Sequence, residues 1–396
     1  MKRTSIEIKA RKFTGKSYIT LPDTSAAIQT SSKLLNSLPS LPSFPSLPAL
    51  FALCLIIISA FPLSLQGAEK TDSAEILVTF LPLGTGSASG TYYPLGKAIG
   101  DLITTRNEDL NVMAFSTRGS NENLQLLEDG EINMAIVQSD AFYFAVKGLK
   151  NYTGRKAPPV KAILSLYPEV VHLVVPGDSK VGGFADLRGK RVIVGAEGSG
   201  NLVTSLVLLS VFGIDENMIT PGYLNYDEAI QAMSRGDYDA FILVAGLPTA
   251  ALTELKARSS VKIVSLTEKD RAIICNNLTY MSNASIPAGT YAEQNSQIPT
   301  VALKALLVCG DQMSSSHVRT ILSTIFDNLD FLAGKHPRAA DISRETALQA
   351  IPDGFTHDAA AAFFQGSKTD TGIDTSDPKI DLKTAAKTEP PSGEAK

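Results

Sequence analysis

Cysteine, histidine and charge are all scarce in this chain of 396 residues. It has three cysteines and four histidines, and 19% of its residues are charged against 44% that are hydrophobic. The histidines show no metal-ligand spacing to one another or to a cysteine, so we expect no metal site. The composition excludes a wholly disordered chain, a coiled coil and a polytopic membrane protein. The length predicts two domains with tails.

Basic residues are also few outside the N-terminal region. Residues 1–68 hold seven of the 36 Lys and Arg residues, which leaves 29 basic against 38 acidic residues in the remainder. Binding to nucleic acid requires clustered Lys and Arg opposite the phosphates. An acidic body of this kind therefore argues against a nucleic-acid partner.

The usual signals of catalysis are missing as well. No Gly-x-Ser-x-Gly elbow occurs, no Gly-Lys-Ser/Thr completes a Walker loop, and Ser89 stands where a dinucleotide fingerprint requires glycine. His172 lies in an apolar run, which favours a packed imidazole over a general base. We expect no catalytic residues and no cofactor.

The three cysteines divide between two regions. Cys54 lies in an apolar N-terminal run, while Cys275 and Cys309 lie beside apolar runs in the body of the chain. Cys275 and Cys309 are interpreted as buried thiols, with a disulfide between them as the alternative.

Residues 1–68 read as an extension with a signal or anchor segment. A basic start is followed by a Ser/Pro/Leu spacer (37–48), an apolar run (49–61) and a polar exit, the order that is typical of a secretory signal. The run is shorter than the ~20 residues that span a membrane as a helix. We expect export to a periplasmic or extracytoplasmic location, with cleavage near Gly67 or Ala68 and a permanent membrane anchor as the alternative.

From Ala74 onward, short apolar strands alternate with amphipathic helices, which predicts an α/β fold with two lobes. We assign 74–167 plus 280–364 to lobe 1, 168–266 to lobe 2 and 267–279 to the return crossover, with two crossing strands as the hinge. Residues 161–167 and 170–175 are expected to form separate strands, and a single helix from about Ser316 to Leu332 is expected to pack on lobe 1. The polar residues 366–396 are predicted to be disordered. 

The two lobes share a short pattern. Residues 130–135 and 236–241 each combine a helix-ending glycine, an acidic residue and a following apolar strand. This weak duplication predicts two lobes of similar construction.

Glycine-rich or polar turns follow four of the expected strands. GTGSASGTYYPLG (84–96) and VGAEGSGN (194–201) join strands to helices in different lobes, and STRGSNENL (116–124) and VQSD (137–140) end two further strands. Ligands of open α/β sheets bind at the carboxyl ends of the strands, where amides and hydroxyls at helix N-termini can hold an anion. Capping of the helices is the structural alternative for Ser199, Asn201, Asn121 and Asn123.

Together these motifs resemble the TAXI family of substrate-binding proteins of TRAP (tripartite ATP-independent periplasmic) transporters. The resemblance runs from about Leu81 to Phe364 and includes SLYPEVVHLVV (165–175), FADLRGKRVIVGAEGSG (184–200), FILVAGLPT (241–249) and IPAGTY (286–291). It implies a two-lobed, type II-like periplasmic-binding-protein fold that closes on a small anionic ligand. It also implies delivery of that ligand to the membrane permease subunits of a TRAP transporter.

The resemblance implies a carboxylate ligand of the glutamate, glutamine or dicarboxylate type, bound by a monomer. An α/β enzyme acting on an anionic or phosphorylated molecule and a membrane-anchored sensor remain alternatives. The residues expected to contact the ligand are Gly86, Ser87, Ser89, Gly90, Thr91, Tyr92, Asn121, Asn123, Gln138, Ser139, Asp140, Ser199, Asn201, Gly246 and Leu247.

Overall fold

The computed structural model describes residues 78–365. The predicted signal or anchor segment (1–68) and the predicted disordered tail (366–396) lie outside these residues.

Ten strands of the described region form one continuous sheet in the order β2-β1-β3-β10-β4-β7-β5-β6, with β8 beside β4 and β9 beside β10. The strands are β1 (Thr79–Gly84), β2 (Leu110–Phe115), β3 (Met134–Gln138), β4 (Val160–Pro176), β5 (Arg191–Ile193), β6 (Thr220–Gly222), β7 (Ala240–Ala245), β8 (Val261–Ile263), β9 (Ser282–Ile286) and β10 (Ile298–Gly310).

Helices connect most of the strands. The α-helices are α2 (Tyr92–Arg106), α3 (Ser120–Glu128), α4 (Ser139–Lys147), α5 (Gly200–Val211), α6 (Tyr226–Ser234), α7 (Ala250–Arg258), α8 (Glu268–Asn277), α9 (Ser315–Phe326), α10 (Leu329–Lys335) and α11 (Asp358–Gln365). The short 3-10 helices are η2 (Lys150–Tyr152), η3 (Phe184–Leu187), η4 (Glu216–Met218) and η5 (Pro337–Asp341).

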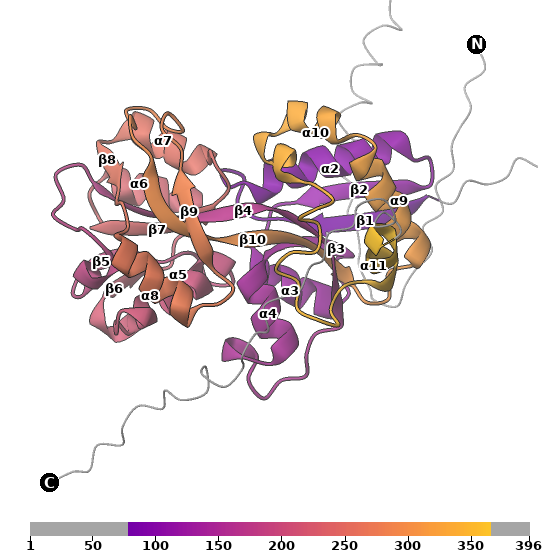
Figure 1. Ribbon diagram of the computed structural model, residues 1–396, viewed down its shortest axis with the longest axis horizontal. Coiled ribbons are helices and arrows are strands. Elements are labelled where there is room, and N and C mark those ends of the chain that lie inside the picture. Colours follow the sequence, from indigo (N-terminus) through magenta and orange to yellow (C-terminus); the bar gives the residue numbers. More distant parts are fainter. Residues whose placement is uncertain (1–77, 366–396) are drawn as a thin grey trace, which may run out of the picture. The chain divides into compact units, whose positions relative to one another are not determined.

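Two long antiparallel strands, β4 and β10, run through both halves of the sheet (Figure 1). We call β1–β3 with α2–α4 and α9–α11 the first half, and β5–β8 with α5–α8 the second half. The strand β10 pairs with β3 of the first half, and β4 pairs with β7 and β8 of the second half. The predicted two-lobed α/β fold with two crossing strands is therefore confirmed.

Both halves have the same topology. In the first half, parallel strands in the order β2-β1-β3 are completed by antiparallel β10, and in the second half β6-β5-β7 are completed by antiparallel β4. The duplicated turns at Gly130 and Gly236 lie at equivalent positions, before β3 and β7, and both glycines have positive φ (71° and 76°). The two turns identified in the sequence are therefore topologically equivalent.

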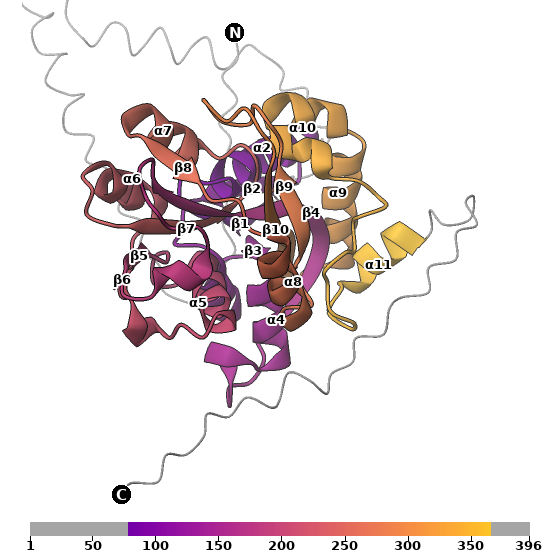
Figure 2. The same cartoon turned by 60° about the vertical axis from the view of Figure 1, so that its left-hand side comes forward.

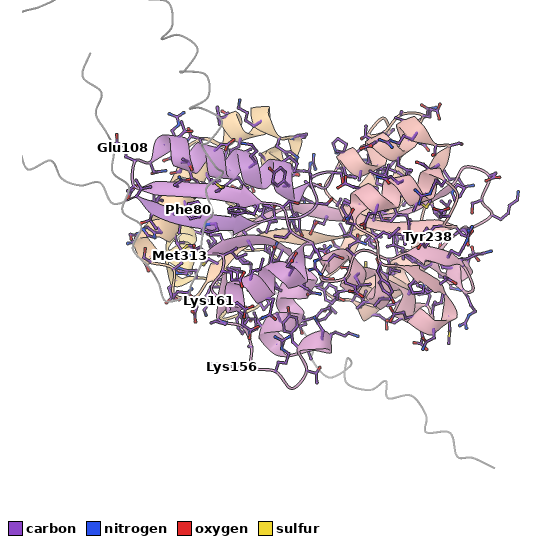
Figure 3. The ribbon with its side chains drawn as sticks, turned by 180° about the vertical axis from the view of Figure 1, so that it is seen from behind. Phe80, Glu108, Lys156, Lys161, Tyr238 and Met313 are labelled. Carbon is purple, nitrogen blue, oxygen red and sulfur yellow. The ribbon has the colours of Figure 1, made fainter. Side chains whose placement is uncertain are left out.

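The helices pack against apolar side chains on both faces of the sheet. On one face of the first half, Leu95 and Ile99 of α2 and Ile321 of α9 pack in a fully buried cluster with Leu83 of β1. A second cluster joins α3 and α4 to α5 of the other half. A third cluster holds α6 and α7 against β7. Figure 2 shows the second-half helices from the side, and Figure 3 places Phe80 of β1 and Tyr238, which precedes β7, in opposite halves.

Three details differ from the sequence-based expectations. Residues 161–167 and 170–175 belong to one strand, β4, in which Pro168 faces a register shift near Lys304. Proline cannot donate a ladder hydrogen bond, and it is tolerated here because the ladder is irregular at this register shift.

The expected helix from Ser316 to Leu332 is two helices, α9 and α10. Asn328 between them leaves the helical conformation (φ −133°, ψ 30°), and its Nδ2 donates to the Thr324 carbonyl at 2.8 Å. Asn side chains compete with the backbone for hydrogen bonds in this way, which ends helices. The expected packing of this region on the first half is confirmed by Val318, Ile321 and Leu322 in its core.

Residues 267–279, assigned to the return crossover, contain helix α8, and the chain returns between the halves along β10. The lobe boundaries at 74–167 plus 280–364 and 168–266 remain a prediction about which parts move as rigid bodies.

This prediction can be tested by small-angle scattering. Because hinge strands absorb φ/ψ changes while packed lobes stay rigid, the radius of gyration should fall when a carboxylate that binds is added at saturation. Scattering of the full chain with and without that carboxylate is the measurement. An unchanged radius of gyration would contradict hinge closure around β4 and β10.

Candidate functional site

One cavity lies at the carboxyl ends of the parallel strands of both halves. Its walls come from the segments that follow β1, β2, β5 and β6, from the last residues of β3 and β7, and from β4. The cavity volume is about 60 Å³, which is room for roughly four to six water-sized groups. This is the edge of the sheet at which α/β proteins bind ligands.

The turn between β1 and α2 contributes the largest group of lining residues. Gly86, Ser87, Gly90, Thr91 and Tyr92 all line the cavity. A Cβ at Gly90 would lie 3.2 Å from the Ser87 carbonyl oxygen and 3.4 Å from the Tyr226 ring, so glycine permits this close approach of the halves. Thr91 precedes α2 without a side-chain cap, which leaves the first amides of that helix without a side-chain acceptor.

The turn after β2 brings a second helix N-terminus to the cavity. Gly119, at φ +116°, precedes α3 without a side-chain cap, and Gly119 and Ser120 both line the wall. The Ser120 hydroxyl accepts a hydrogen bond from the Gln138 amide nitrogen of the backbone at 2.9 Å. The side-chain oxygen of Gln138 has no hydrogen-bond partner, so Gln138 brings an uncommitted amide to the cavity.

The second half adds the N-termini of α5 and α6. Ser199 caps α5 by accepting from the Leu202 amide at 3.0 Å, and Asn225 caps α6 with Glu228 in a capping box. Ser199, Gly200, Asn201, Asn225 and Tyr226 line this side of the cavity. Four helices therefore begin at one cavity, and their partial positive charges favour an anionic group there.

A buried acid, Glu169 of β4, also lines the cavity. It is 2% exposed, and its Oε2 accepts a hydrogen bond from the Tyr92 hydroxyl at 2.7 Å. Burial raises the pKa of the Glu169 carboxyl well above its usual range. The guanidinium that lines the cavity, Arg118, is largely exposed and pairs with Glu122 at 3.5 Å.

Several hydrogen bonds hold the two halves together around the cavity. The Ser87 hydroxyl donates to Asp227 at 3.0 Å, the Ala251 amide donates to the Ser89 carbonyl at 3.0 Å, and the Glu122 amide donates to the Gly198 carbonyl at 2.9 Å. Thr204 of α5 donates to Asp140 of α4 at 2.6 Å. The halves are therefore in contact on several sides of the cavity, as expected of a closed receptor.

Eight of the fifteen predicted ligand-binding residues line this cavity, namely Gly86, Ser87, Gly90, Thr91, Tyr92, Gln138, Ser199 and Asn201. Asn201 also has a structural role, because its side chain bonds the Val194 and Ile242 carbonyls and the Val244 amide. Contact between these residues and a ligand remains a prediction.

The other seven do not line it. Asn123 bonds the Thr85 and Ile136 carbonyls, Ser139 accepts from the Lys304 amide, and Asp140 accepts from Thr204. Each of these side chains is therefore engaged within the protein.

Ser89, Asn121, Gly246 and Leu247 also lie off the cavity wall. Ser89 is buried behind it, with its hydroxyl 3.3 Å from that of Ser87. Asn121 lines a neighbouring surface groove, which shares Arg118 with the cavity. Gly246 packs where a Cβ would meet the Tyr167 and Arg338 side chains, and Leu247 is buried next to it.

Sequence reasoning missed several lining residues, among them Glu169, Ser120 and Tyr226. Glu169 carries a usable signal, because an acid within the apolar stretch SLYPEVVHLVV must be buried if that stretch is a central strand. Tyr226 follows a short strand, β6, that has no strong pattern in the sequence.

The surroundings of His172 and of the two cysteines show the structural state of each side chain. His172 is fully buried, close to the Val170 carbonyl (2.9 Å) and the Tyr291 hydroxyl (3.0 Å), which fits a packed imidazole, and burial lowers its pKa to about 4. Cys275 and Cys309 are free thiols, so the alternative of a disulfide is not realised. Within residues 78–365, no three acidic, His or Cys side chains are grouped as metal ligands. No helix in this range is long and apolar enough to span a membrane.

Comparison with known proteins gives one family and a set of distant structures. A model of the NMT1-like family matches residues 83–366. The alkanesulfonate-binding protein SsuA from Xanthomonas axonopodis pv. citri, bound to MOPS, is 16% identical, with 73% of this chain and 84% of that chain covered and a TM-score of 0.41. The aliphatic sulphonate-binding protein SsuA from Escherichia coli is 15% identical, with 72% and 89% covered and a TM-score of 0.40.

A putative L-cystine ABC transporter protein from Listeria monocytogenes is 15% identical, with 67% of this chain and 99% of that chain covered and a TM-score of 0.41.

The burial of the Asp140 carboxyl predicts a stability that depends on pH. Burial raises the pKa of Asp140 from 3.8 to about 6, so the folded state binds a proton more tightly than the unfolded state. The contribution of Asp140 to the free energy of unfolding is therefore highest below the unfolded pKa and falls as pH rises to the folded pKa. Between about pH 4 and pH 7, the free energy of unfolding of wild type should fall by about 2–3 kcal/mol relative to that of Asp140→Asn.

Urea denaturation of both proteins across this range is the measurement. Parallel curves for wild type and Asp140→Asn would show that Asp140 does not titrate with a raised pKa.

Proposed function

The chain belongs to the NMT1-like family, and from this premise we propose that it is an extracytoplasmic solute receptor that binds a small carboxylate. The observation that carries the proposal is the meeting of four helix N-termini, α2, α3, α5 and α6, at one cavity between two matching halves. Helix N-termini supply amide donors and partial positive charge, and the two halves supply a means of enclosing a small molecule.

Amides and hydroxyls, rather than a guanidinium, are proposed to hold the carboxylate. Ser87, Thr91 and Ser120 bring hydroxyls to the cavity wall, whereas the Ser199 hydroxyl on the same wall donates to the Ala196 carbonyl at 2.7 Å. Arg118 is exposed and already paired with Glu122, so it is poorly placed to clamp a ligand in a bidentate manner. A cavity of about 60 Å³ favours a compact ligand.

The finer parts of the proposal rest on the sequence motifs. The TAXI-type pattern between about Leu81 and Phe364 supports the membrane permease subunits of a TRAP transporter as the partner, and glutamate, glutamine or a dicarboxylate as the ligand class. The order of residues in segment 1–68 supports export. A receptor delivers its ligand unchanged, so we propose no catalytic activity.

A ligand panel tests the proposed function. Isothermal titration and thermal shift with monocarboxylates, dicarboxylates, amino acids, sugars and simple cations should find binding among the carboxylates without turnover. At a concentration 100-fold above the dissociation constant, a bound carboxylate should stabilise the fold by ~2.7 kcal/mol. Tight binding of sugars or cations, with no carboxylate bound, would overturn the proposal, and chemical conversion of a bound carboxylate would favour an enzyme.

Ser87 and Asn121 offer a matched pair of variants, because sequence reasoning assigned both to the ligand and only Ser87 lines the cavity. Ser87→Ala removes a hydroxyl that faces both the cavity and Asp227. A hydrogen bond to a charged group contributes ~1.5–3 kcal/mol, so affinity for a binding carboxylate should fall roughly ten- to hundredfold. Asn121→Ala should lower affinity less.

Titrations of both variants, with urea melts in the absence of the carboxylate, separate binding from stability. Equal losses of affinity in the two variants would contradict the assignment of the cavity as the binding site.

A further inference from the structure

Glu169 places a carboxyl group inside a cavity whose other features favour an anion. The side chain is 2% exposed, lines the same wall as Tyr92, and receives one hydrogen bond, from the Tyr92 hydroxyl to Oε2. No Lys, Arg or His of the described residues forms an ion pair with it. A carboxylate ligand in a cavity of about 60 Å³ would therefore lie beside a second, unneutralised carboxylate.

Two carboxylates cannot both remain ionised at such close range without strong repulsion. A shared proton between them relieves the repulsion and converts it into a hydrogen bond.

We propose that Glu169 is a neutral carboxylic acid in this cavity and selects the ligand in that form. Its proton-bearing oxygen donates a hydrogen bond to the carboxylate of the ligand. The inference rests on the proposed function, because it assumes a carboxylate ligand. Oε2 accepts from Tyr92, which leaves Oε1 to carry the proton. The proton comes from solvent and stays on Glu169, so no other bond forms or breaks.

Burial and a neighbouring acid favour the neutral form of Glu169, and the one hydrogen bond it receives favours the ionised form. Tyr92 on α2, Tyr167 on β4 and Tyr226 on α6 bring hydroxyls near it, and Asp140 on α4 adds a second acid. Burial is the main cause that raises the pKa of Glu169, Asp140 raises it further, and the Tyr92 hydrogen bond lowers it in part.

The charged groups at the edge of the cavity do not offset this effect. Arg118 is paired with Glu122, and Asp227 on α6 adds a negative charge next to Ser87. Arg338 on η5 pairs with Asp341 at 2.8 Å and lies off the cavity wall.

A neutral Glu169 gives the affinity for a carboxylate a definite dependence on pH. A bound carboxylate raises the pKa of Glu169 above its value in the free protein, because it repels the ionised form. The affinity for an ionised carboxylate is therefore constant below the pKa that Glu169 has in the free protein. Above that pKa it falls by up to tenfold per pH unit. A ligand whose ammonium group pairs with ionised Glu169 gives the opposite sign, with affinity rising as pH rises.

The protonation of Glu169 can be tested without any ligand. Infrared difference spectra of the full chain at neutral pH should contain a protonated carboxylic acid band that is lost in Glu169→Gln. Asp140→Asn is the matched control, since Asp140 is the other buried acid of this region. The band should persist in Asp140→Asn. Its absence in wild type, or its loss only in Asp140→Asn, overturns the proposal.

Binding of glutarate and L-glutamate, which differ by the ammonium group, tests the role in recognition. Titrations from about pH 6 upward, where the carboxyl groups of glutarate are ionised, should show glutarate affinity falling as pH rises, and Glu169→Gln should remove this dependence. Glu169→Leu, which lacks a donor, should bind glutarate roughly ten- to hundredfold more weakly than wild type at the low end of this range, with Glu169→Gln losing less. Urea melts of both variants establish that they are folded.

Affinity for L-glutamate that rises with pH, with glutarate unbound, overturns the proposal in favour of an ammonium partner for Glu169. If no carboxylate of any kind binds, the proposed function fails with it. If carboxylates bind while the infrared band is absent, only the role of Glu169 fails.

Discussion

The antiparallel pairing of β4 with β10 is the contact on which the rest of the molecule depends. The register from Val160 opposite Gly310 to Val170 opposite Ala302 continues on one side into β3 and on the other into β7. Both sets of parallel strands are thus held in one sheet, with their carboxyl ends directed at a common cavity. Because Glu169 lies within β4, the same pairing places the buried acid between the two sets of helix N-termini.

Close approach of the two halves places special demands on the residues at the cavity. A Cβ at Gly200 would lie 1.9 Å from the Gln138 side-chain oxygen and 2.5 Å from the Ser120 hydroxyl, so only glycine fits there. The glycines of the two β–α turns therefore serve contact between halves as well as access to amides. A ligand in this cavity would be surrounded by backbone and short polar side chains, with Tyr92 and Glu169 as its larger neighbours.

The sequence predicted what is local and missed what depends on distant pairing. The turns at Gly86–Tyr92 and Ser199–Asn201 were identified because glycine, hydroxyl and strand-to-helix signals lie next to one another. The single strand β4 was divided at Pro168, since its continuity depends on a bulge near Lys304 far along the chain. The site roles of Asn123, Ser139 and Asp140 could not be judged from the sequence, because their partners Ile136, Lys304 and Thr204 are set by tertiary packing. Glu169 lies within strand β4, so the glycine and hydroxyl signals of the turns do not indicate it.

The order of strands also has a consequence for the time course of folding. The second half is one continuous segment inserted between β4 and β10, and β3 has no antiparallel neighbour until β10 is available. The pairing of Val137 with Leu306 closes a very long loop, which is entropically costly and slow. During synthesis the first half therefore remains an incomplete sheet until most of the chain has been made, whereas β5–β7 can associate as soon as they appear. In a chain of this kind the N-terminal half completes its sheet last, which suits a protein that is proposed to cross a membrane before it folds.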